Sequence, residues 1–311
     1  MKNLVWFRND LRLHDNPALS QACAKADQVV GIYIVTFKQW EEHNDSPNKI
    51  AFWFRSLIEL QKDLHKLNIP LCILKCDTYD DCPQKILEFA SANEINNLYF
   101  NIEYPVNELK RDEQVQAVLE KMGTSCFSFH DQVIHVPGTL KTKAGTNFSV
   151  YSPFKRCWLA ELDYALLEEH AIPTIKQPVS VNQQDEYDLH SYKQSNINQD
   201  LWPVGEESIQ KMIVNFLDRK GSDYKTDRNF PGLTATSMMS PYINSGVVSS
   251  KWCLNQARAR NYDALDEGDK GLVHWISEIL WREFYRHIIY NFPRVSMGKA
   301  CLLYTSPSPR D

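Results

Sequence analysis

The sequence predicts an α/β protein: a doubly wound parallel sheet in the first half of the chain, followed by a partial all-α domain. Three observations carry this prediction. Apolar, β-branched runs alternate with helical patterns in the first half, a polar and Pro-containing connector follows, and strand patterns are absent after it. Strands that alternate with helices pair in parallel, with right-handed crossovers and with helices on both faces of the sheet.

Four strands are expected in the first half. They are Asn3–Phe7, Val29–Val35, Leu71–Lys75 and Leu98–Asn101. Apolar residues at helical spacing predict intervening helices over 48–67, 80–92 and 106–122. Asn16 followed by Pro17 predicts the N-cap and the first turn of the first helix.

A connector is expected where the regular patterns end. Between about Glu168 and Trp202 the sequence is rich in Pro, Asn, Gln, Ser and Asp, which is typical of a surface segment. Helices are then predicted over 206–220, 250–261 and 271–291. The expected organisation is a sheet domain (1–135), a connector (136–205), a partial helical domain (206–300) and a non-native tail (301–311) that ends in Ser-Pro-Ser-Pro-Arg-Asp.

The charge balance limits the kinds of partner. Lys and Arg number 34 against 39 Asp and Glu, a net charge of −5, so any site for a polyanion must be local. The eight cysteines lack CxxC pairs and the nine histidines lack ligand spacing, which predicts reduced thiols and no metal site. Since no membrane span or secretory signal is visible, we expect a location inside the cell, in the cytoplasm, nucleoid or nucleus. We also expect a monomer.

The first candidate site is the segment from Trp6 to Asn16, which is dense in charges and follows the first strand. Ligands of open parallel sheets bind at such strand ends, but neither of the glycine-rich phosphate loops occurs in the sequence. The favoured interpretation is a set of salt bridges that pins this loop over the edge of the sheet.

The second candidate is the hydroxyl-rich run that leads into Ser240 and Pro241. Ser240 is predicted as an N-cap with Pro241 at the first helical position, and Gly246 as a left-handed C-terminal cap. Unpaired N–H groups at a helix start favour an anion such as phosphate. An ordinary capped helix without a ligand is the alternative.

The third candidate is the helix over 274–287. At about 100° per residue, one face holds Trp275, Glu278, Trp281, Arg282 and Tyr285. The opposite face holds Ile276, Leu280 and Phe284, which we expect in the core. Aromatic rings beside an acid and a guanidinium would suit an extruded base or a flavin, and the alternative is a solvated face with an Arg–Glu pair.

Together these motifs resemble the DNA photolyase and cryptochrome family, and specifically its microbial class I cyclobutane pyrimidine dimer photolyases. The resemblance runs from Leu4-Val5-Trp6-Phe7-Arg8 to the Trp-Arg-Glu-Phe-Tyr helix, and includes Tyr104-Pro105-Val106-Asn107-Glu108 and Ser152-Pro153-Phe154-Lys155. It implies a deoxyribodipyrimidine photo-lyase, which repairs UV-damaged DNA in the light by electron transfer from reduced FAD.

The resemblance also implies roles for individual residues. FAD would be held by Tyr224, Thr236, Ser237, Met238, Met239, Ser240, Trp275 and Arg282. Glu278 would hydrogen-bond the pyrimidine dimer and Trp281 would stack on it, as the catalytic pair. DNA would contact Glu278, Ile279, Leu280, Trp281, Arg282, Glu283, Phe284 and Tyr285. Asn107 and Glu108 match the positions that contact a methenyltetrahydrofolate antenna.

Family members continue for well over a hundred residues beyond this sequence, so the resemblance implies a C-terminally truncated chain that does not repair DNA by itself. Two alternatives stay open. One is a cryptochrome, a blue-light receptor that keeps flavin but not repair; the other is a non-enzymatic α/β ligand-binding module. Trp281 beside Glu278 favours repair.

Overall fold

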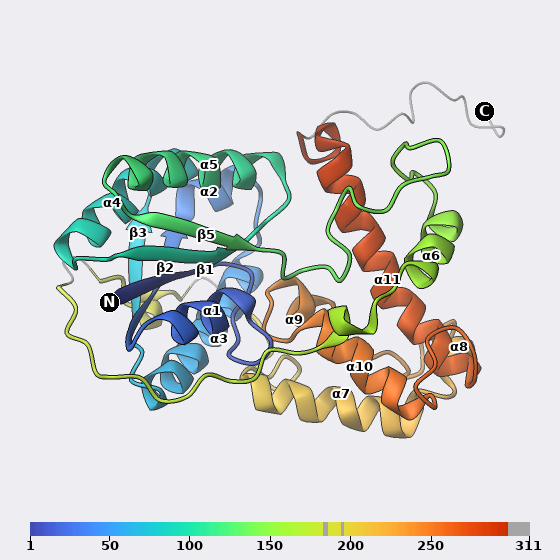
Figure 1. Ribbon diagram of the computed structural model, residues 1–311. Helices are drawn as coiled ribbons and strands as arrows, with labels where there is room; N and C mark the ends of the chain where they lie inside the picture. The colour runs from blue at the N-terminus through green and yellow to red at the C-terminus, as the bar shows by residue number, and fades with distance from the viewer. Residues whose placement is uncertain (183–185, 194–195, 298–311) are drawn as a thin grey trace, which may run out of the picture.

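The computed structural model describes residues 1–182, 186–193 and 196–297 (Figure 1). Its sheet has five parallel strands in the order β3-β2-β1-β4-β5. The strands are β1 (Lys2–Phe7), β2 (Gln28–Thr36), β3 (Leu71–Cys76), β4 (Asn97–Asn101) and β5 (Ser125–Phe129). Because the order reverses between β1 and β4, the sheet is doubly wound, and the predicted fold of the first half is confirmed.

Helices cover both faces of this sheet. They are α1 (Pro17–Lys25), α2 (Phe37–Glu42), α3 (Pro47–Lys66), α4 (Cys82–Ala92) and α5 (Val106–Lys121). Alternate residues of β1 point to opposite faces: Val5 and Phe7 share a core with residues of α1 and α3, while Leu4 and Trp6 pack with residues of α4 and α5. The four predicted strands and three predicted helices are each confirmed to within two residues.

Strand β5 is an element that the sequence reading missed. Its five residues, Ser-Cys-Phe-Ser-Phe, lie at the edge of the sheet, and all of them are exposed or half-buried. An edge strand of this kind buries little apolar surface, so its pattern is too weak to predict. The predicted cap of α1 is confirmed, because the Asn16 side chain accepts a hydrogen bond from the Leu19 N–H at 3.1 Å.

The connector follows the surface of the sheet domain. Lys176 donates its N–H to the Leu67 carbonyl and Tyr187 donates to that of Ile73, both at 2.9 Å. The range 136–205 also contains helix α6 (Tyr151–Ala160), which was not predicted and which contacts α11. The predicted tail, 301–311, lies outside the described residues.

The described residues after 205 form helices and loops without a strand. The helices are α7 (Glu206–Lys220), α8 (Tyr224–Asp227), α9 (Ser240–Asn244), α10 (Ser250–Arg260) and α11 (Lys270–Asn291). The three long ones confirm the predicted helices. Figure 1 shows α11 as a long helix beside the sheet domain, with α6 next to it.

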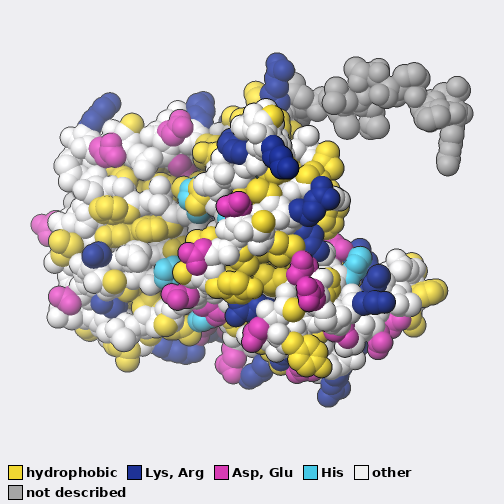
Figure 2. Space-filling model, turned by 45° about the vertical axis from the view of Figure 1, so that its right-hand side comes forward, with side chains coloured by type: hydrophobic (Ala, Val, Ile, Leu, Met, Phe, Trp, Pro, Cys, Tyr) yellow, Lys and Arg dark blue, Asp and Glu magenta, His cyan; other side chains and the backbone are white. Residues whose placement is uncertain are grey.

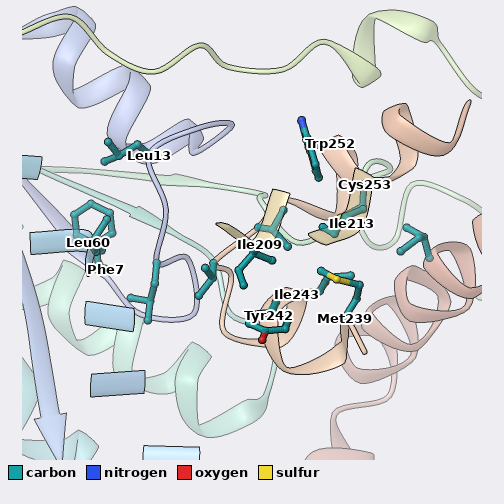
Figure 3. Packing of buried hydrophobic residues seen from close by; sticks show 14 of the residues in the cluster. Phe7, Leu13, Leu60, Ile209, Ile213, Met239, Tyr242, Ile243, Trp252 and Cys253 are labelled. Atoms are coloured by element: carbon teal, nitrogen blue, oxygen red, sulfur yellow. The ribbon is translucent and has the colours of Figure 1, made fainter. Parts of the chain in front are cut away.

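A continuous hydrophobic core joins the two halves. Phe7 and Leu60 of the sheet domain belong to the same buried cluster as Ile213, Tyr242 and Cys253 of the helical part (Figure 3). A single packed core of this kind fixes the helical part relative to the sheet.

The charged loop after β1 reinforces this junction. Arg8 pairs with Asp112 at 3.2 Å, and Arg12 pairs with Asp131 and also donates to the Gly246 carbonyl at 3.2 Å. The side chains of these four ion-pairing residues are all at most 7% exposed. The interpretation of this segment as a salt-bridged loop is therefore confirmed, and the loop positions the start of the helical part.

Among the described residues, no helix combines the length and the apolar character needed to cross a bilayer. The cysteines within the described ranges carry free thiols.

Candidate functional site

A cavity of about 1040 Å³ lies between α11, the loop before α9 and the first turns of α3. A volume of this order suits a large organic ligand. Its lining includes the whole set of residues that the resemblance assigned to FAD: Tyr224, Thr236, Ser237, Met238, Met239, Ser240, Trp275 and Arg282. Folding therefore brings these separate sequence positions together around one space.

The loop before α9 has an unusual backbone. Met238 adopts a left-handed conformation with φ of +53°, which is uncommon for a residue with a side chain. The Nε1–H of Trp275 donates to the Ser237 hydroxyl at 3.2 Å and so ties α11 to this loop. Strained backbone of this kind is concentrated at functional sites, and here it shapes the wall of the cavity.

The predicted capping role of Ser240 is wrong by one residue. Helix α9 begins at Ser240 itself, and the residue before it, Met239, has a helical backbone and makes no side-chain cap. The Ser240 side chain is exposed and lines the cavity, while Pro241 follows inside the first turn. Gly246 adopts the predicted left-handed conformation, with φ of +67°.

Arg282 supplies a cation to the cavity wall. It donates to the carbonyl oxygens of Gln132 at 2.7 Å and Ile243 at 3.5 Å, and no carboxylate of the described residues forms an ion pair with it. Burial, together with the charge of Arg286, lowers the pKa of Arg282 to about 9. A desolvated guanidinium without an acidic partner would be stabilised by an anion in the cavity.

Glu278 also lines the cavity, and its carboxylate is half-exposed. It forms an ion pair with Arg228, and the His274 ring lies 3.7 Å away. The Arg228 guanidinium stands 5.2 Å from the centre of the Tyr224 ring. Arg228 is a site residue that the sequence reading missed, although its position four residues after Tyr224 on a helical segment was a usable signal.

Trp281 does not line the cavity, in contrast to the predicted face. Its ring stacks on Tyr151 of α6, with the ring centroids 3.7 Å apart and the planes 13° from parallel. Tyr285, whose ring lies 5.6 Å from that of Trp281, does line the cavity and is 55% exposed. The helical period placed Trp281 on the correct side of α11, but packing against α6 decided where its ring points.

The opposite face of α11 is buried as predicted, since Ile276, Leu280 and Phe284 lie in the core. Glu283 is also buried, at 3% exposure, and its carboxylate accepts hydrogen bonds from the N–H groups of Ile134 and His135 and from the Trp158 indole. Three of the implied DNA contacts are therefore buried and cannot touch DNA: Leu280, Glu283 and Phe284. Ile279 is buried too, but lines the cavity.

Asn107 and Glu108 lie at the start of α5 and do not line the cavity. The Asn107 amide is 3.4 Å from the His43 ring, and the N–H of Val106 donates to the Ser296 hydroxyl at 3.2 Å. Burial and the charge of Glu103 raise the pKa of Glu108 to about 7, against the opposing effect of Arg111. This second polar site thus joins the sheet domain to the segment after α11.

The surface around α11 combines apolar and basic groups. Figure 2 shows hydrophobic side chains in the middle of the face that the helical part presents, with Lys and Arg side chains near them. Lys155, Arg228 and Arg286 are cations placed on or beside α11. A local cationic area in a chain with net charge −5 is the arrangement that a polyanion would require.

The doubly wound sheet and the helical cavity together define an α/β protein with a ligand-sized site in its helical part. A family model described as DNA photolyase matches residues 3–177, more than half of the chain. The chain therefore belongs to the DNA photolyase family.

Similar proteins agree with this assignment. The deoxyribodipyrimidine photo-lyase of Buchnera aphidicola subsp. Acyrthosiphon pisum is 34% identical over 308 residues, which cover 97% of this chain and 62% of that protein. The Escherichia coli enzyme of the same name is 33% identical over 304 residues, or 97% of this chain and 63% of its own. The chain thus spans less than two thirds of the length of these curated relatives.

Solved structures show the same fold. A bacterial class III photolyase from Agrobacterium tumefaciens superposes with a TM-score of 0.80 at 25% identity, covering 94% of this chain and 60% of its own. A Synechocystis cryptochrome reaches a TM-score of 0.81 at 19% identity, with 94% and 62% coverage.

Proposed function

We propose that this chain carries the flavin and DNA-lesion sites of a deoxyribodipyrimidine photo-lyase, which repairs cyclobutane pyrimidine dimers in the light. The observation that carries the proposal is the shared cavity: the residues implied for FAD and the acid implied for the dimer line one space. Relatives that are 33–34% identical bear the name of this activity.

The donor set of the cavity suits FAD. The cavity lining contains the hydroxyl side chains of Thr236, Ser237 and Ser240 and the half-buried cation Arg282, a combination that binds a diphosphate. Trp275, only 2% exposed, supplies an apolar wall for an aromatic ring system. When bound and reduced, FAD supplies the electron that splits the dimer in the light.

The protein's own contribution is orientation and charge. Glu278 lies where its carboxylate can hydrogen-bond the polar edge of an extruded pyrimidine, and Arg228 holds that carboxylate in place. Trp281 presents an indole beside the cavity on which the flipped bases would stack, and Tyr285 adds an exposed ring at the rim. The cations beside α11 would contact the phosphates of the same strand.

The test uses the natural protein and separates cofactor binding from repair. FAD binding is followed by flavin absorbance, and repair by the loss of dimers from an irradiated oligonucleotide. Arg282→Ala is expected to weaken FAD binding by about tenfold or more, because a charged hydrogen-bond donor is lost. Glu278→Gln is expected to keep FAD and to slow repair, whereas Lys211→Ala, on the exposed face of α7, should change neither.

Two results would contradict the proposal. The first is a protein that takes up no FAD, and the second is unimpaired repair by the Glu278→Gln variant. Flavin binding without any repair would favour the cryptochrome alternative instead.

We further propose that the polar site at the start of α5 accepts a folate antenna through Asn107 and Glu108. Its support is an exposed amide beside a half-buried carboxyl group, with the His43 ring next to them. Methenyltetrahydrofolate added to the natural protein should show a shifted absorbance band, and Asn107→Ala with Glu108→Ala should abolish that shift while FAD binding is retained. Loss of FAD together with the folate would contradict two separate sites.

A further inference from the structure

We infer that Tyr151 is a positioning residue of the lesion site, because it fixes the plane of the Trp281 indole and thereby makes helix α6 part of that site. The inference rests on the proposed function, in which Trp281 is the ring that receives the extruded bases. It adds a residue from the connector, which neither the motifs of α11 nor the cavity lining identifies.

The contact between these two rings is the closest ring pair among the described residues. The centroids are 3.7 Å apart and the planes are 13° from parallel, so Tyr151 covers one face of the indole. The Tyr151 hydroxyl donates to the Ser277 carbonyl at 3.0 Å, one turn of α11 before Trp281. The tyrosine is thus held at both ends, by its ring and by its hydroxyl.

Helix α6 itself is seated firmly on α11. Phe154 is 1% exposed and packs against Phe284, and the Trp158 indole donates to Glu283 at 2.7 Å. The Lys155 ammonium donates to the Ser277 hydroxyl at 2.8 Å. Because these contacts follow one another along α6, Tyr151 is held in position by the whole helix and not only by its own side chain.

A fixed indole plane matters for stacking a flipped base. A ring that must be ordered on binding loses conformational entropy, and a ring that is already ordered does not. Because Tyr151 covers one face of the Trp281 ring, a pyrimidine would have to stack on the other face; the centroid of the Tyr285 ring lies 5.6 Å from that of Trp281, with the planes 27° from parallel. Burial also raises the pKa of the Tyr151 hydroxyl to about 12, so it remains a hydrogen-bond donor at neutral pH.

A Tyr151 that is displaced by the DNA would have the opposite effect on lesion binding. Tyr151 could instead occupy the place of a base and leave when DNA binds. In that case its removal would strengthen lesion binding. The hydrogen bond to Ser277 and the packing of α6 favour a tyrosine that stays.

The experiment compares the affinity of the natural protein for two oligonucleotides, one with a single thymine dimer and one undamaged, by fluorescence anisotropy. Tyr151→Leu is expected to lower the ratio of the two affinities by about three- to tenfold, the range expected for loss of one aromatic pair. Tyr151→Phe keeps the ring and should stay within about twofold of the parent. An unchanged or increased ratio for Tyr151→Leu overturns the inference.

Controls separate this role from general damage. Tyr164→Leu removes a connector tyrosine that is 60% exposed and should leave the ratio unchanged. FAD uptake should also be unchanged in Tyr151→Leu, because Tyr151 does not line the cavity. If the leucine variant fails to fold, Tyr151→His, with a smaller flat ring, takes its place in the same measurement with the same expected direction.

A spectroscopic readout tests the stack directly. The near-UV circular dichroism that Trp281→Phe removes from the parent should also be reduced in Tyr151→Leu but retained in Tyr151→Phe. If the parent itself shows no preference for dimer-containing DNA, the proposed function fails. If the parent shows the preference and Tyr151→Leu keeps it, only the positioning role fails.

Discussion

At the scale of single residues, Glu283 shows how one buried carboxylate joins three segments. It lies on α11 and accepts hydrogen bonds from the N–H groups of Ile134 and His135, after β5, at 3.0 and 2.9 Å, and from the Trp158 indole of α6. Burying this carboxylate costs free energy because it loses its hydration, and the three donated hydrogen bonds offset that cost. Glu283 is therefore a structural residue within a helix whose other face carries the site.

Replacing Glu283 with Ala should destabilise the protein. The change leaves buried donors without partners, and the expected loss is about 3 kcal/mol in the free energy of unfolding. Urea denaturation followed by far-UV circular dichroism measures it. Glu207→Ala, at an exposed position of α7, should change the free energy by less than about 0.5 kcal/mol. Equal effects of the two changes would contradict the role of Glu283.

The raised pKa of Glu108 predicts that the stability of the protein depends on pH. Its pKa is raised by burial from the ordinary 4.5 to about 7, so the folded protein favours the protonated carboxyl group. The stability that this group contributes is complete below about pH 4.5 and is lost as the pH rises through about 7.

The Glu108→Gln variant keeps a neutral side chain at every pH. Its stability relative to the parent should therefore rise between about pH 4.5 and 7 and level off above that range. Urea midpoints at several pH values test this. A stability difference that stays constant over the range would show that Glu108 titrates alike in the folded and unfolded states.

At the scale of elements, the turn after α9 packs directly on the charged loop after β1. Gly246 has φ of +67°, and a Cβ atom there would lie 2.1 Å from the Asn9 carbonyl oxygen and 2.5 Å from the Asp10 Cα. Only glycine combines this conformation with such a close approach of two backbone segments.

Gly246→Ala should destabilise the protein by at least about 2 kcal/mol, since backbone atoms must move to admit the methyl group. Gly232→Ala is the matched control, because a Cβ atom at that position meets nothing within 4 Å. Thermal unfolding of both variants distinguishes the two positions, and a neutral Gly246→Ala would mean that the two loops can separate without cost.

At the scale of the whole molecule, the sheet domain and the helical part share one hydrophobic core. Buried polar contacts add to it: Asp15 accepts from the Ser249 hydroxyl, and Glu206 accepts from the Leu13 N–H at 2.8 Å. A cavity lined by both α3 and α11 depends on this junction, because its walls come from both halves of the molecule.

Shared packing predicts that the two halves unfold together. In urea, tryptophan fluorescence and far-UV circular dichroism should give coincident, single transitions. The tryptophans sample both halves, for example Trp6 in the sheet and Trp275 in α11. Two separated transitions would show that the sheet domain is stable without its helical partner.

Local sequence patterns determined much of this protein. The alternation of β-branched runs and helical periods predicted the parallel sheet, and Asn16 with Pro17 predicted the start of α1. The period of α11 correctly assigned Leu280 and Phe284 to the core. These features depend on neighbours within a few residues, so the sequence alone is enough to predict them. The family resemblance added the set of residues that proved to share one cavity.

Tertiary structure alone decided where the functional side chains point. Trp281 turns toward Tyr151, more than a hundred residues earlier in the chain, and Glu278 pairs with Arg228 of another segment. The burial of Glu283 was set in the same way, by hydrogen-bond partners far away in the sequence. Helical periodicity determines the direction in which a side chain points from the helix axis. Which residue it packs against depends on the tertiary fold, because that partner is distant in the sequence.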